Sequence, residues 1–205
     1  MGWKRVGVLG AIAIMFGTST TTAQATDIVV RVFNNYGVPP DDLRDTQTYA
    51  AASLSGAGVN VTWINCWHGA QEAADAPARC REDVGADLVL RLQRAATTNG
   101  DRYVSLGFAL VMPEGMPFLA TVYADLAEGV ARRAGVAAQP VLGRAIAHEI
   151  GHLLLNTNSH PVDGLMRGAW SQQELRRNVS RDWEFQEDEA ATLRTAVAQR
   201  RQMLN

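Results

Sequence analysis

The segment that decides the fold reads HEIGHLLLNTNSH and runs from residue 148 to residue 160. It holds three of the four histidines in a chain of 205 residues. Successive residues of an α-helix are turned by about 100°, so His148 and His152 differ by about 40° and project from one face, one turn apart. Glu149 lies about 60° beyond His152 and flanks the pair. The spacing therefore predicts a helix with one face suited to binding a metal ion.

Two histidines and a glutamate in this order are typical of a hydrolytic zinc site. Two neutral imidazoles and a third protein ligand hold the zinc, and the fourth position stays open for water. Zinc lowers the pKa of that water to about 7, which supplies a nucleophile at neutral pH. A carboxylate beside the site accepts the proton and passes it to the leaving amine. We expect one catalytic zinc ion, with His148 and His152 as ligands and Glu149 as the general base.

The same helix carries the apolar residues that would bury it. Pro140 favours the start of a helix, and the helical pattern continues through the histidines to Leu155. Four aliphatic residues fall on the side opposite the histidines: Leu142, Ile146, Ile150 and Leu153. The helix is thus predicted to dock into a core with one side and to line a cleft with the other.

These residues resemble the metzincin clan of zinc metallopeptidases, in particular its matrixin-like bacterial members. The clan's pattern is H-E-x-x-H-x-x-G-x-x-H followed by a methionine turn; here HEIGH precedes a third histidine and the sequence Gly164-Leu165-Met166. The resemblance is specific over about residues 140–170. It implies a zincin-like fold, zinc-dependent peptide hydrolysis, and Met166 as the methionine-turn residue beneath the metal.

The third histidine departs from the clan's spacing. Asn158 stands where the clan has its third histidine, and His160 follows His152 by eight residues instead of six. We expect the helix to end at Leu155 and Asn156 to take the left-handed conformation normally given to glycine. A loop two residues longer than the clan's would then return His160 to the metal as the third ligand.

The displaced histidine leaves other interpretations open. Asp163 is the alternative third ligand, although imidazole is the commoner partner in a hydrolytic three-ligand site. The leading hypothesis for function is a secreted zinc endopeptidase that binds extended peptides along a sheet edge, with residues 103–111 as the candidate strand. The alternatives are an exported binding module whose zinc site is structural or degenerate, and a zinc amidase acting on a non-peptide amide.

The N-terminus has the pattern of a signal peptide. Lys4 and Arg5 precede an apolar run over residues 6–16, and Ala23-Gln24-Ala25 matches an A-x-A cleavage site. Eleven apolar residues fall well short of the roughly 20 that a membrane-spanning helix needs. We expect residues 1–25 to be removed and residues 26–205 to form a catalytic domain in a secreted or periplasmic protein, with no membrane association after cleavage.

Two cysteines, Cys66 and Cys80, are predicted to form a disulfide. Exported proteins meet an oxidising environment, and the bond would close a loop of 15 residues. The alternative is a metal pair supported by His68, which follows Cys66 closely. No C-x-x-C spacing supports that alternative, and two residues make a poor zinc site.

Charge and composition restrict the partners. The chain carries 19 basic and 21 acidic residues, and loss of the two basic residues within residues 1–25 leaves a net charge of −4. The arginines are scattered along the chain and form no basic cluster, so the sequence does not indicate nucleic-acid binding. We expect a monomer whose partner is a peptide or protein substrate.

Hydrophobic periodicity predicts one α+β domain. Alternation or short apolar runs indicate strands over residues 27–33, 59–65, 87–92, 103–111 and 118–124. Helical spacing and capping patterns indicate a first helix that opens at residues 38–42 and is ended by Gly56 and Gly58, a short helix from Ser171, and helices over residues 125–135, 140–155 and 186–204. The expected architecture is a mixed, twisted sheet with an early helix, followed by the active-site helix and a helical C-terminal part.

Overall fold

A computed structural model describes residues 26–66, 77–83, 85–96 and 105–202. The predicted signal peptide, residues 1–25, and His68 lie outside these ranges. Within them, no helix is both long enough and apolar enough to cross a membrane.

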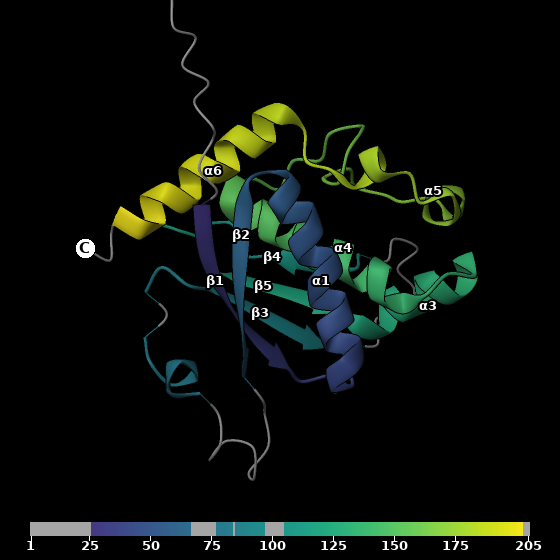
Figure 1. Ribbon diagram of the computed structural model, residues 1–205, viewed down its shortest axis with the longest axis horizontal. Coiled ribbons are helices and arrows are strands. Elements are labelled where there is room, and N and C mark those ends of the chain that lie inside the picture. Colours follow the sequence, from purple (N-terminus) through teal and green to yellow (C-terminus); the bar gives the residue numbers. More distant parts are fainter. Residues whose placement is uncertain (1–25, 67–76, 84, 97–104, 203–205) are drawn as a thin grey trace, which may run out of the picture.

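A five-stranded mixed sheet forms the frame of the domain (Figure 1). The strands lie in the order β2-β1-β3-β5-β4, and all neighbours are parallel except β4 and β5, which are antiparallel. Their bounds are Thr26–Asn34 (β1), Val59–Cys66 (β2), Leu88–Gln93 (β3), Gly107–Ala109 (β4) and Leu119–Tyr123 (β5). Strand β4 therefore forms one edge of this sheet.

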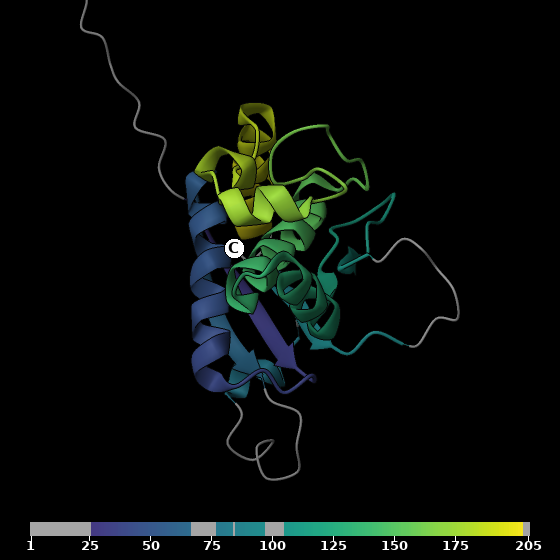
Figure 2. The ribbon, with the colours of Figure 1, turned by 90° about the vertical axis from the view of Figure 1, so that its right-hand side faces the viewer.

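Helix α1 follows β1 in the chain, and the other four helices follow β5. Their bounds are Pro40–Gly56 (α1), Ala124–Ala134 (α3), Ala138–Leu155 (α4), Gln172–Arg177 (α5) and Glu187–Gln202 (α6), with short 3-10 helices at Ala78–Cys80 (η1) and Ser180–Trp183 (η2). Helix α1 contacts β2, α4 contacts β4 and β5, and the two helices contact each other, so both lie on one face of the sheet. Helix α6 lies in the upper part of the molecule in both views and is seen nearly end-on in Figure 2.

Helices α1 and α4 approach closely at Gly143. A Cβ at this position would lie 2.6 Å from the carbonyl oxygen of Thr46 and 2.6 Å from the Cβ of Tyr49. Both contacts are shorter than non-bonded atoms accept, so the packing of α4 on α1 requires glycine here. The core that results contains the four aliphatic residues predicted to bury α4, which are Leu142, Ile146, Ile150 and Leu153.

The loop between β2 and β3 is fastened in two ways. Cys66 at the end of β2 and Cys80 in η1 form the predicted disulfide. Asp87 lies 2.8 Å from Arg31 Nε on β1 and 2.8 Å from Arg79 Nη2 in η1. Burial alone would raise the pKa of the Asp87 carboxyl, but hydrogen bonds from Arg79 and Arg31 outweigh burial and lower that pKa.

The structure confirms the predicted fold class and most of the predicted elements. It shows a single α+β domain with a mixed sheet, and four of the five predicted strands lie within one residue of their expected bounds. The strand predicted over residues 103–111 was too long: residues 103 and 104 lie outside the described ranges, and β4 covers only Gly107–Ala109. The Val111 N–H donates to Ala109 O at 3.0 Å, which turns the chain away from the ladder.

The helix boundaries follow the local signals in the sequence. Helix α4 begins at Ala138, so Pro140 lies in the first turn, where its missing N–H removes no helical hydrogen bond. It ends with Asn156 in the left-handed conformation, at φ 49° and ψ 45°. Helix α5 carries the predicted capping box between Ser171 and Glu174. The predicted end of α4 and the capping box of α5 are confirmed, whereas α4 begins two residues before the predicted start at Pro140.

Candidate metal centre

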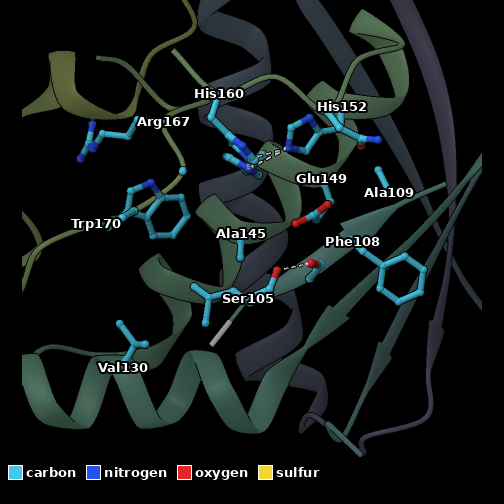
Figure 3. Close-up of a pocket in the computed structure, with 16 residues that line it drawn as sticks. Ser105, Phe108, Ala109, Val130, Ala145, Glu149, His152, His160, Arg167 and Trp170 are labelled. Atoms are coloured by element: carbon cyan, nitrogen blue, oxygen red, sulfur yellow. Dashed lines mark hydrogen bonds between the residues drawn. The ribbon is translucent and has the colours of Figure 1, made fainter. Parts of the chain in front are cut away.

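Three histidines converge at the C-terminal half of α4 (Figure 3). His148 and His152 project from one face of the helix, as their spacing predicts, with 3.0 Å between their Nε2 atoms. The loop after the helix brings the ring of His160 to them, and its Nε2 lies 3.3 Å from that of His148 and 3.1 Å from that of His152. The described part of the chain has no other group of three or more such ligands.

Backbone carbonyls fix which nitrogen of each helix histidine carries the proton. His148 Nδ1 lies 2.9 Å from Leu165 O, and His152 Nδ1 lies 2.7 Å from Thr157 O. A carbonyl oxygen only accepts hydrogen bonds, so each Nδ1 must carry the hydrogen and each Nε2 of a neutral ring presents a lone pair. The two Nε2 atoms therefore form no hydrogen bond with each other. Such a pair of facing lone pairs is suited to binding a cation.

The spacing of the three nitrogens fits zinc. Ligand atoms about 2.0–2.1 Å from a tetrahedral zinc ion lie roughly 3.3–3.4 Å from one another. The observed Nε2 separations of 3.0, 3.1 and 3.3 Å come close to this geometry. Burial lowers the pKa of His148 to about 4, so this ring is neutral at physiological pH, as a metal ligand must be. Burial also lowers the pKa of His152.

The loop after α4 brings His160 to the two helix histidines. Asn156 turns the chain out of α4, and Thr157 places its carbonyl against His152 while its hydroxyl accepts the Ser159 N–H at 3.1 Å. A Cβ at Gly168 would lie 3.3 Å from Cγ of His160, so the chain after Met166 supports that ring from behind. The structure places Asp163, the alternative ligand, on the exposed surface and outside the histidine cluster.

Glu149 lies beside the histidines with an unsatisfied carboxyl group. It is 5% exposed, and its Oε2 has no hydrogen-bond partner among the described residues. Burial raises its pKa to about 8. A Cβ at Gly107 of β4 would lie 2.9 Å from Glu149 Oε1, so only glycine leaves room for the carboxylate at the sheet edge. The sequence predicted Glu149 but gave no indication that Gly107 would lie next to it.

Met166 forms an apolar floor beneath the helix, which is the place expected for a methionine turn. It is fully buried, and a Cβ at Gly151 would lie 2.5 Å from its sulfur. The residue before it, Leu165, supplies the carbonyl that orients His148. One short segment thus both supports α4 and fixes a ring that lies on it.

A cation–aromatic stack, which the sequence did not predict, holds that segment in place. The guanidinium carbons of Arg144 on α4 and Arg167 lie 3.9 Å and 4.9 Å from the ring centroid of Trp183. The Arg144 side chain also donates to the Asn178 side chain, and burial lowers the pKa of Arg144 to about 10. Trp170 packs edge-on between Trp183 and His148, at centroid distances of 5.4 Å and 6.0 Å.

A cavity of about 540 Å³ opens over the histidines and Glu149. Its lining comes from β4 and the residues before it, α3, α4, the loop after α4, and the segment after Met166. The lining residues are Ser105, Leu106, Gly107, Phe108, Ala109, Val130, Ala145, His148, Glu149, His152, Asn158, His160, Arg167, Gly168, Ala169 and Trp170. This volume lies within the roughly 300–1,000 Å³ typical of ligand sites.

Solved structures of metallopeptidases share this fold. Metalloproteinase-II from Bacteroides fragilis aligns with a TM-score of 0.53 at 15% identity, over 86% of this chain and 55% of that protein. A zinc-dependent peptidase from Methanocorpusculum labreanum (strain Z) aligns with a TM-score of 0.52 at 16% identity, over 80% of this chain and 99% of that protein. This chain thus spans about half the length of the Bacteroides protein. No protein-family model matches the chain, and no curated protein matches it in sequence.

Proposed function

We propose that this protein is a secreted zinc-dependent endopeptidase of the metzincin type, with a lengthened loop before its third histidine ligand. The observation that carries the proposal is the set of three Nε2 atoms no more than 3.3 Å apart, next to the buried, unpartnered carboxyl of Glu149. The likeness in fold to a zinc-dependent peptidase supports it.

Three ligands under an open cavity support a catalytic role more than a structural one. Structural zinc sites are closed by four protein ligands, whereas catalytic sites keep one position open. Here His148, His152 and His160 form the group, and the cavity above them is large enough for a substrate. Signal-peptide cleavage after Ala25 remains part of the proposal.

The chain's own residues provide the proton transfers. When zinc is bound, it polarises the peptide carbonyl and makes water a better nucleophile at neutral pH. Glu149 takes the proton from the attacking water and delivers it to the leaving amine, and burial suits a carboxyl to both steps by bringing its pKa toward neutrality. A pKa of about 8 applies to the metal-free site, because a divalent cation nearby favours the ionised carboxylate.

The free edge of β4 is the proposed seat of an extended peptide. Tyr123 N–H donates to Leu106 O at 2.8 Å, and Leu110 N–H donates to Leu119 O at 2.9 Å. In an antiparallel pair the N–H and C=O groups of every second residue point toward the partner strand. Leu106 and Leu110 bond to β5 and its flanking residues in this way, so the N–H and C=O groups of Gly107 point away from β5, toward the open edge. A peptide added there would run past Glu149 by β-augmentation.

The test measures metal content and cleavage on the same preparations. Wild-type protein is incubated with a diverse peptide library before and after chelation, and products are identified by mass spectrometry. We expect about one equivalent of zinc, cleavage that chelation removes and zinc restores, and loss of cleavage without loss of zinc in Glu149→Gln. Glu114→Gln, at an exposed carboxylate, is the matched control. A zinc-loaded protein that cleaves no peptide would contradict the proposal.

A further inference from the structure

The turn formed by residues 164–167 contacts the metal centre and the C-terminal part of the chain at the same time. Leu165 O accepts the Nδ1–H of His148 at 2.9 Å, and Leu165 N–H donates to Glu184 O at 2.8 Å. The orientation of the His148 ring therefore depends on how this turn is attached to residues 182–184.

The side chain of Arg167 closes this turn and attaches it. Gly164 lies at φ 79°, and glycine adopts both signs of φ at little cost, so the backbone preference of this residue alone does not hold the turn. Arg167 Nη1 donates to Gly164 O at 2.8 Å, which closes the turn from within. The same nitrogen donates to Asp182 O at 2.7 Å, which fastens the turn to η2.

Arg167 is itself held in one position. It is 7% exposed, its guanidinium carbon lies 4.9 Å from the ring centroid of Trp183, and its Nη2 lies 3.4 Å from Oε1 of Glu174. Arg144 of α4 packs on the same indole ring at 3.9 Å, so the metal-binding helix is joined to this arrangement. Figure 3 shows the guanidinium of Arg167 directed away from the histidines, so any effect on them passes through the turn.

We propose that Arg167 is a positioning residue of the metal centre: by bridging two backbone carbonyls it fixes the Leu165 carbonyl that orients His148, and it thereby raises the affinity for zinc. The inference rests on the metal-binding part of the proposed function and adds a residue to it. Hydrogen-bond partners of ligating histidines typically contribute about 10–100-fold to metal affinity.

The first measurement compares the zinc affinity of two Arg167 variants by competition with a chromogenic chelator. Arg167→Met removes both hydrogen bonds and keeps a long side chain, and we expect its zinc affinity to be at least about tenfold lower than that of the wild type. Arg167→Lys should stay close to the wild type, because one ammonium nitrogen can donate to both carbonyl oxygens. Both variants lose the planar stacking of a guanidinium on Trp183, so that loss does not account for a difference between them.

These two variants can also overturn the inference. Wild-type zinc affinity in Arg167→Met would do so, and so would an equal loss of affinity in both variants. If Arg167→Met does not fold, Arg167→Lys decides the matter alone: affinity close to the wild type supports the inference, and a loss of about tenfold or more overturns it.

A second measurement follows the oriented ring itself. Nuclear magnetic resonance of zinc-loaded protein with isotopically labelled histidine detects the His148 Nδ1–H and its exchange with solvent. We expect this proton to exchange at least about tenfold faster in Arg167→Met than in the wild type or Arg167→Lys, because the hydrogen bond to Leu165 O opens more often. Equal exchange in all three proteins would overturn the inference.

Two controls separate positioning from general stability. Arg176→Met removes an arginine whose Nε donates to Ala134 O at 2.8 Å and which does not line the cavity, so it should leave zinc affinity unchanged. Asp87→Asn breaks a buried ion pair with Arg31 in the sheet, and it tests whether lost stability alone weakens zinc binding. A loss of zinc affinity in Asp87→Asn equal to that in Arg167→Met would overturn the inference.

None of these measurements needs a peptide, so the inference and the proposed function can fail separately. Zinc binding that responds to Arg167→Met as expected, in a protein that cleaves no peptide, would contradict the peptidase and leave the role of Arg167 standing. Cleavage by the wild type together with unchanged zinc affinity and unchanged His148 exchange in Arg167→Met would overturn the inference and leave the peptidase proposal intact.

Discussion

Gly151 and Met166 are in such close contact that no side chain fits between them. A Cβ at Gly151 would lie 2.5 Å from the Met166 sulfur and 2.7 Å from Cε1 of Phe185. The glycine inside the HEIGH motif is therefore required by packing, because it brings α4 down onto the turn that contains Met166. The same contact holds Leu165 O against the ring of His148 at 2.9 Å.

Gly151→Ala should therefore destabilise the domain. The added methyl group overpacks a fully buried contact, and we expect the free energy of unfolding to fall by about 1–3 kcal/mol, measured by urea denaturation. Gly56→Ala is the matched control, since among the described residues no heavy atom lies within 4 Å of the position of its Cβ. A urea midpoint for Gly151→Ala equal to that of the wild type would contradict the inference that Gly151 and Met166 are in close contact.

The metal-binding face of α4 and the end of that helix could be predicted from local rules. His148, Glu149 and His152 follow from a 100° turn per residue, and the left-handed Asn156 follows from the tolerance of asparagine for that conformation. Rules of this kind depend only on residues close in sequence, so they can be applied before the fold is known.

The remainder of the site depends on contacts between distant parts of the chain. Gly107 lies beside Glu149, and Trp183 stacks on Arg144, although each pair is about 40 residues apart in sequence. A glycine in a short strand can indicate a close backbone approach, but periodicity cannot identify the group that approaches it. The length of β4 was mispredicted for a different reason, because a local turn from Ala109 to Val111 ends the strand.

Loss of the third histidine should weaken zinc binding while the fold persists. His160 is exposed and lies on a loop, so His160→Ala removes a ligand and little packing. We expect zinc affinity to fall by more than about 100-fold, since even partners outside the ligand shell contribute 10–100-fold, and competition with a chromogenic chelator measures this. Asp163→Ala should bind zinc like the wild type. If Asp163→Ala lowered the zinc affinity more than His160→Ala did, Asp163 would be the third ligand.

Asp87 should contribute strongly to stability because it forms ion pairs with two arginines. Its side chain is 4% exposed and lies 2.8 Å from both Arg31 and Arg79. Asp87→Asn removes the carboxylate that the buried Arg31 side chain binds at 2.8 Å, and we expect a loss of about 3 kcal/mol in the free energy of unfolding. Asp41→Asn breaks an exposed pair with Arg44 and should cost less than about 1 kcal/mol. Equal effects of the two changes would contradict this assignment.

The buried carboxyl of Glu149 should make the stability of metal-free protein fall as pH rises. Its pKa in the folded state is about 8, raised by burial from 4.5. Between these values the folded state retains a proton that the unfolded state has released, so the free energy of unfolding decreases with pH, by about 5 kcal/mol in all. Urea denaturation of chelated protein at pH 5 and pH 8, compared with Glu149→Gln, isolates this contribution because the two proteins share every other ionisable group. Saturating zinc should abolish the difference between the two pH dependences, since a neighbouring cation favours the ionised carboxylate. Identical pH dependences in chelated wild type and Glu149→Gln would show that Glu149 is ionised without metal.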